Sequence, residues 1–193
     1  IKTMNSLIYL FGFGYKEINI IEAQNLVNAG YKLSINDYHI IEELTKGSDL
    51  LIDDVITDHT APILFTVFMR RLMDGENILV LTSKRCYANS EYHQEIIEWI
   101  NEWFYKLTSN RDFWKVQIFN KVEDVELASR IIVSSADDIL EKNIVSHQWF
   151  DELKTVLFLN GTEIFSESLT SNNILLSILR DQSPVIQSIV LSN

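Results

Sequence analysis

Asp53, Asp54, Asp58 and His59 stand close together in the segment LLIDDVITDHTAP, residues 50–62. Carboxylate oxygens are ligands of magnesium and calcium, and imidazole nitrogens bind transition metals, so these side chains could hold a cation. Their spacing matches no recognised ligand motif. Capping of a following helix, with solvation of the remaining charges, is the simpler explanation. The segment therefore carries two hypotheses, an ion-binding site and a structural turn.

The elements around this segment can be predicted from the apolar runs of the chain. Six short runs rich in Val, Ile and Leu alternate with segments of helical periodicity, which indicates parallel strands joined by helical crossovers. The sequence predicts an α/β fold, a doubly wound, mainly parallel sheet of about six strands. Segment 50–62 would then lie at the carboxyl end of the first strand, where such sheets bind ligands. The runs lie at residues 49–53, 77–82, 115–119, 130–134, 155–159 and 187–191.

Helical periodicity marks several connections between these runs. An apolar helix is expected at residues 63–73, closed by Asp74-Gly75, and a long amphipathic helix at 89–107, with Trp99 at the boundary of its buried stripe. Two weakly similar segments, residues 14–30 and 30–47, each predict an amphipathic helix before the first strand. We expect these two N-terminal helices to form a cap on the sheet.

The chain is acidic, with 27 Asp and Glu against 16 Lys and Arg and a net charge of −11. Nucleic-acid binding depends on neutralising phosphates, so this charge disfavours it unless a local basic patch exists.

A single cysteine, Cys86, excludes an internal disulfide and fits a reducing compartment, so we expect a cytoplasmic protein. No apolar run approaches the length of a membrane span, so we expect no membrane partner. Whether the chain is part of a longer protein stays open.

Five segments occur in an order and spacing typical of one family. They are GYKLSINDYHIIEELTKGSDLLID (30–53), ILVLTSKRCYAN (78–89), RIIVSSADDIL (130–140), LKTVLFLNGTEIF (153–165) and NNILLSILRDQSPVIQSIVLSN (172–193). Together they resemble the first RecA-like domain of superfamily 2 helicases, the DEAD-box and DExH-box proteins. The resemblance implies a RecA-like helicase domain 1 at residues 35–193, preceded by an N-terminal helical extension at residues 1–34.

The resemblance also implies positions for nucleotide chemistry, and the chain departs from the family pattern at each of them. Asp37 replaces the glutamine that reads adenine, Thr60 replaces the phosphate-loop lysine, and Ala61 replaces the hydroxyl that binds the metal. Leu159 and Asn160 replace the Asp-Glu pair that holds magnesium. The full set of degenerate positions is Asp37, Asp54, Asp58, His59, Thr60, Ala61, Leu159, Asn160 and Thr162.

These departures have a common physical consequence. A phosphate loop uses glycines, a helix amino terminus and a lysine to balance the phosphate charge. Asp53, Asp54 and Asp58 would instead repel a phosphate, and Asp58 or Thr60 is expected to cap the next helix, worth about 1 kcal/mol. The sequence thus predicts a structural turn, no ATP hydrolysis by the family's mechanism, and no bound cofactor.

The family contacts nucleic acid through two loop segments. The matching positions here are Ser83, Lys84, Arg85, Ser134, Ser135 and Asp137. Their hydroxyls and the basic pair could bind phosphate, although the surrounding acidity indicates a solvated surface with weak affinity at most. Cys86 follows the basic pair without an evident dyad partner, and the histidines show no zinc spacing.

The sequence therefore predicts a helicase-like domain that is not an enzyme and serves as a binding or scaffolding module. Its expected partner is another protein or the second helicase domain of a longer parent. Two alternatives remain open. One is a nucleotide- or metal-binding enzyme with an altered phosphate loop, using Asp54, Asp58 and His59. The other is a weak binder of single-stranded nucleic acid, using Lys84 and Arg85.

Overall fold

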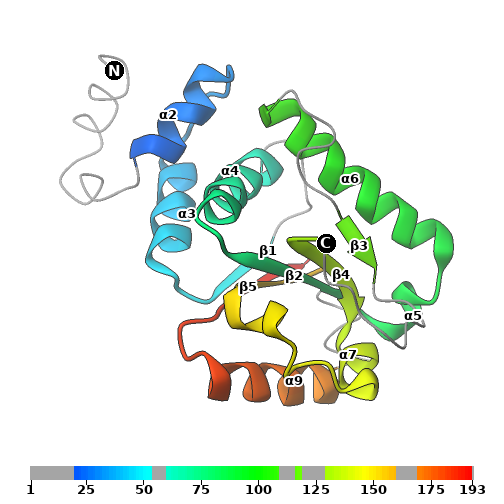
Figure 1. Ribbon diagram of the computed structural model, residues 1–193. Helices are drawn as coiled ribbons and strands as arrows, with labels where there is room; N and C mark the ends of the chain where they lie inside the picture. Colours follow the sequence, from blue (N-terminus) through cyan, green and yellow to red (C-terminus); the bar gives the residue numbers. More distant parts are fainter. Residues whose placement is uncertain (1–19, 54–59, 109–115, 119–128, 160–168, 193) are drawn as a thin grey trace.

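Six parallel strands form one sheet in the order β1-β6-β5-β2-β4-β3 (Figure 1). The computed structural model describes residues 20–53, 60–108, 116–118, 129–159 and 169–192. The predicted α/β class and parallel sheet are confirmed, and the strand boundaries agree within two residues. The strands are β1 (Leu50–Asp53), β2 (Asn77–Thr82), β3 (Val116–Ile118), β4 (Ile131–Ser135), β5 (Leu153–Phe158) and β6 (Gln187–Ser192).

Helices cover both faces of the sheet, as the order of the strands requires. The chain moves from β1 to β2 and β3 across the sheet, then reverses through β4 and β5 to β6. Because parallel crossovers share one hand, this reversal sends the later helices to the opposite face. One face carries α2 (Ile20–Asn28), α3 (Ile35–Lys46), α4 (Thr60–Met73) and α6 (Ser90–Thr108). The other carries α7 (Ala136–Lys142), η2 (Gln148–Glu152) and α9 (Leu169–Gln182), while the short α5 (Lys84–Tyr87) leads into α6.

Side chains of the central strands alternate between two apolar cores. Along β2, Ile78 and Val80 join the core beneath α4 and α6, while Leu79 and Leu81 join the core beneath α7 and α9. All six residues of β2 are buried. A strand buried on both faces must be apolar at consecutive positions, which explains the continuous apolar runs of the sequence.

The two predicted N-terminal helices are present as α2 and α3, and both pack against α4. Ala23 and Leu26 of α2 are fully buried and belong to the same core cluster as α4. The proposed domain boundary at residue 34 stays a prediction. No helix within residues 20–53, 60–108, 116–118, 129–159 and 169–192 is long and apolar enough to cross a membrane.

Helix α4 is apolar on nearly all sides and starts three residues before the predicted position. It opens with Thr60, Ala61 and Pro62, and a proline is tolerated in this turn because its missing N–H has no partner within the helix. The helix ends as expected. Gly75 adopts a left-handed φ of 92°, and the N–H of Glu76 donates to the carbonyl of Arg71 at 3.0 Å, which closes the last turn.

Arg71, in the last turn of α4, ties this helix to two other elements. Its guanidinium donates to the hydroxyl of Thr155 in β5 at 2.7 Å and to the carbonyl of Leu44 in α3. The neighbouring Arg70 points to solvent and makes an exposed ion pair with Asp74 at 3.4 Å. The two adjacent arginines therefore differ sharply in their contribution to packing.

We predict that Arg71→Ala lowers the free energy of unfolding by about 2–4 kcal/mol, because two acceptors lose a charged donor. Arg70→Ala is the matched control and should change stability by less than about 1 kcal/mol, as is usual for an exposed ion pair. Urea denaturation followed by tryptophan fluorescence measures both changes. Equal losses in the two variants would contradict the structural role of Arg71.

Candidate functional site

The carboxyl edge of the parallel sheet is the place where α/β proteins bind ligands, and most predicted site residues lie there. This edge includes the start of α4, the ends of β2 and β4, and the residue after β5. Asp54, Asp58, His59, Asn160 and Thr162 lie outside the described residues, as does the side chain of Asp53. The metal hypothesis at Asp53–His59 thus rests on the sequence alone. The described residues hold no group of three or more His, Cys, Asp or Glu side chains suited to a metal.

The first turn of α4 occupies the place of the phosphate-binding turn. A phosphate bound there would contact the backbone N–H groups of this turn. Pro62 has no N–H, while Thr60 and Ala61 are only 5% and 0% exposed. Thr60 is the first helical residue, so the capping position before it lies outside the described residues. This turn offers an anion few donors and little access.

Asp37, at the position implied for adenine recognition, takes part in capping α3. Its carboxylate accepts a hydrogen bond from the N–H of Ser34 at 2.6 Å, and the Ser34 hydroxyl accepts one from the N–H of Asp37 at 3.3 Å. These reciprocal bonds form a capping box at the start of the helix. The residue is also 97% buried, which leaves its carboxylate little contact with solvent.

Leu159, at the position implied for the magnesium carboxylate, lies directly after β5. Its N–H donates to the carbonyl of Leu81 at 2.8 Å, so the main chain continues the pairing with β2. The side chain is 3% exposed and packs in the apolar core beneath α4. An alkyl side chain cannot ligate a metal or polarise water, so this position contributes packing.

The candidate nucleic-acid positions divide into buried serines and exposed bases. Ser83 caps α5, and its hydroxyl accepts from the N–H of Cys86 at 3.2 Å. Ser135 caps α7 in the same way, with Asp138 as donor at 3.2 Å. Ser134 is likewise fully buried at the end of β4. These hydroxyls serve the local fold and lie beneath the surface.

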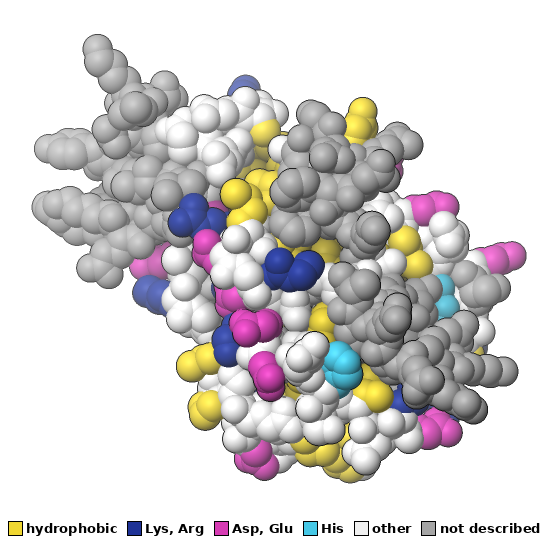
Figure 2. Space-filling view, viewed as in Figure 1, with side chains coloured by type: hydrophobic (Ala, Val, Ile, Leu, Met, Phe, Trp, Pro, Cys, Tyr) yellow, Lys and Arg dark blue, Asp and Glu magenta, His cyan; other side chains and the backbone are white. Residues whose placement is uncertain are grey.

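Lys84 and Arg85 are exposed at the start of α5. On the face drawn in Figure 2, the basic side chains of the described residues are interspersed with acidic ones and form no continuous patch. An isolated pair of basic side chains attracts phosphate only weakly in a chain whose net charge is −11. The exposed part of this candidate interface is therefore limited to two side chains.

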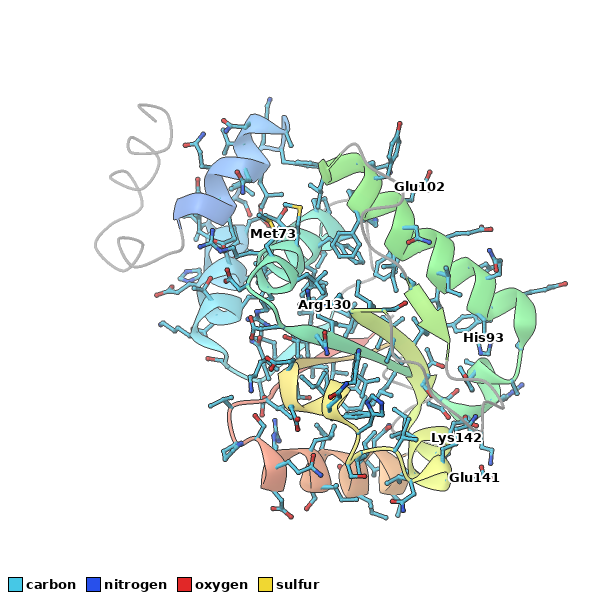
Figure 3. The ribbon with its side chains drawn as sticks, in the orientation of Figure 1. Met73, His93, Glu102, Arg130, Glu141 and Lys142 are labelled. Atoms are coloured by element: carbon cyan, nitrogen blue, oxygen red, sulfur yellow. The ribbon has the colours of Figure 1, made fainter. Side chains whose placement is uncertain are left out.

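One cluster at this edge was missed by the sequence analysis. The rings of Tyr87 and His93 pack with centroids 4.3 Å apart, and Asp138 of α7 acts electrostatically on both. His93 lies on the inner side of the first turn of α6 (Figure 3), and its buried Nε2 has no hydrogen-bond partner in the part of the chain that the structure describes. Sequence spacing did not reveal this cluster, because Asp138 is distant in the chain and reaches the two rings only through the pairing of β2 with β4.

Burial dominates the titration of this cluster. It lowers the pKa of the His93 imidazole, against the attraction of Asp138. Burial also raises the pKa of the Tyr87 phenol, and the Asp138 carboxylate raises it further, while the Ser134 hydroxyl acts in the opposite direction. Both rings are therefore uncharged at neutral pH, which suits a packing role between α5, α6 and α7.

The strand order and the helices on both faces define an α/β domain with a RecA-like fold, which solved helicase structures share. Solved structures of the same fold include the DUF1998 helicase MrfA bound to DNA, with a TM-score of 0.62 and 15% identity over 91% of this chain. MrfA bound to DNA and AMPPNP gives a TM-score of 0.60 and 16% identity over 87% of this chain. A hypothetical ATP-dependent RNA helicase from Sulfolobus tokodaii gives a TM-score of 0.55 and 14% identity over 90% of this chain.

These likenesses concern the fold. The chain spans 26% of the MrfA chain bound to DNA and 25% of the MrfA chain bound to DNA and AMPPNP. It spans 50% of the Sulfolobus tokodaii chain. No protein-family model and no curated protein sequence matches it. The predicted resemblance to a RecA-like helicase domain is thus confirmed as a fold, while nucleotide chemistry is a separate question.

We predict that His93→Gln flattens the pH dependence of stability on the acid side. The folded-state pKa of His93 lies below the ordinary value of 6.5, so the unfolded chain takes up the proton first. Its contribution to stability is present above about pH 6.5 and is lost as pH falls through the lowered pKa. Urea denaturation between pH 5 and 8 measures this slope.

His39→Gln, on the exposed face of α3, is the control for loss of an imidazole. If His93→Gln keeps the full acid-side slope of the wild-type protein, the buried imidazole has no part in that slope.

Proposed function

We propose that this RecA-like domain no longer binds or hydrolyses ATP and acts as a binding or scaffolding module. Its partner would be the second helicase domain of a longer parent protein or a separate protein of the same assembly. The observation that supports this proposal most is the first turn of α4, where Pro62 removes an N–H donor and Thr60 and Ala61 are buried. A domain of this kind would work in the reducing cytoplasm, in keeping with its one free cysteine, Cys86.

Two further positions agree with a lost nucleotide site. The Asp37 carboxylate is used in capping α3, and Leu159 packs in the core where a magnesium ligand would be needed. The Asp37 carboxylate would have to leave the cap of α3 to contact a ligand, and the alkyl side chain of Leu159 cannot ligate a metal. The binding or scaffolding role itself is proposed by analogy with the fold.

We predict that titration calorimetry with Mg-ATP and Mg-ADP gives no binding heat up to millimolar nucleotide. The protein must show a cooperative thermal unfolding transition in the same buffer, which controls for misfolding. Binding with a micromolar Kd would overturn the proposal and favour a nucleotide-binding enzyme with an altered loop. The variants Asp54→Asn, Asp58→Asn and His59→Ala would then locate the site.

Weak binding of single-stranded nucleic acid is the second candidate function. It is supported by the exposure of Lys84 and Arg85 and by the DNA present in both MrfA structures. Burial of Ser83, Ser134 and Ser135 leaves few further groups that could contact a phosphate.

We predict a Kd weaker than about 100 μM for a labelled oligonucleotide at physiological salt, with affinity rising as salt is lowered. Fluorescence anisotropy measures this binding, and Lys84→Ala/Arg85→Ala should abolish what is seen at low salt. Glu91→Gln/Glu95→Gln, on the exposed face of α6, makes an equal but opposite change in charge and is the control. Tight binding that survives Lys84→Ala/Arg85→Ala would place the nucleic-acid interface elsewhere.

A further inference from the structure

Glu22 is a buried carboxylic acid on the inner face of α2. The residue is 3% exposed, and its Oε2 is shielded from solvent and has no hydrogen-bond partner among the described residues. Ala23 and Leu26 of the same helix are fully buried and apolar. A charged carboxylate in this position is costly unless it is paired.

The charged groups that act on Glu22 all lie near the end of α4. They are Arg70, Arg71 and Asp74, and among the described residues of α3, which also packs against α2, no charged side chain contributes. Both arginines have other partners. Arg71 donates to Thr155 and to the Leu44 carbonyl, and Arg70 pairs with Asp74. No ion pair joins Glu22 to a base in the part of the chain that the structure describes.

The balance of these effects favours the neutral acid. Burial raises the pKa of Glu22 and is the largest effect, a backbone hydrogen bond lowers it, Arg70 and Arg71 lower it, and Asp74 raises it. The Glu22 carboxylate thus binds a proton more readily when α2 is docked than when the helix is released. Protonation of Glu22 therefore stabilises the docked helix at acid pH. This stabilisation is lost as pH rises from 4.5, the ordinary pKa of a glutamate, through the raised pKa of Glu22.

Few contacts hold helix α2 in place, so protonation of one side chain can change how firmly it is docked. Its nine described residues are fewer than a helix needs to be stable in water by itself, and they pack against α3 and α4. From residue 22 onward, where the side chains are described, Ala23 and Leu26 are its fully buried apolar residues. Figure 1 shows α2 as an outer layer over α3 and α4, away from the strands.

We propose that α2 is a proton-responsive arm, which docks on α4 when Glu22 is protonated and is released when Glu22 ionises. Release uncovers apolar surface on both partners, because Ala23 and Leu26 leave the core cluster that they share with α4. The arm would regulate access to that surface. This role does not depend on the proposed loss of nucleotide binding at the carboxyl edge of the sheet.

Hydrogen exchange tests the arm directly. Protection factors of the α2 amides, each referenced to the unfolded chain at the same pH, should fall about threefold or more between pH 4 and pH 8. In Glu22→Gln, which mimics the neutral acid, α2 should stay protected across this range. Amides of β2 and β4 should show equal protection in both proteins, which controls for global stability.

Glu95→Gln, on the exposed face of α6, removes one carboxylate without touching α2 and should behave as the wild-type protein does. The proposal is overturned if wild-type α2 has the same protection at pH 4 and pH 8. It is also overturned if Glu22→Gln keeps the wild-type pH dependence.

Discussion

Helix α4 is the element on which the rest of the structure depends, because it is apolar on nearly every side and must be covered on every side. Ten of its fourteen residues are buried. The sheet covers one side of it, α6 packs along a second, and α2 and α3 close the remainder. The N-terminal helices are thus required by the composition of α4. Arg71 then secures the end of the helix by joining it to α3 and β5.

The same constraint shapes the candidate site. A phosphate-binding helix presents an accessible first turn, whereas α4 begins with buried residues and a proline. Around it, the polar groups at the carboxyl edge are largely occupied by the fold. Ser83 and Ser135 cap helices, and Asp37 belongs to a capping box. These contacts support the proposed binding role, since groups held in caps are not available to a ligand without local unfolding.

Prediction from sequence succeeded where a local pattern has one physical meaning. Continuous apolar runs mean strands buried on both faces, so β2 and β4 were placed within one residue of their observed bounds. Trp99 was expected at a boundary, and it is partly buried with its ring 5.0 Å from that of Phe65. The start of α4 was placed late, because Thr60-Ala61-Pro62 resembles a loop until the helix behind it is known.

The sequence by itself determined the α/β class, the parallel sheet and its strands, since these follow from periodicity and residue type. Only the tertiary structure decided which groups are buried and what they contact. Glu22 reads as an ordinary surface acid of an amphipathic helix, and His93 as an isolated histidine. Glu22 is buried against α4, and His93 is buried against Tyr87 near Asp138. Contacts between elements distant in the chain depend on packing that no local pattern encodes.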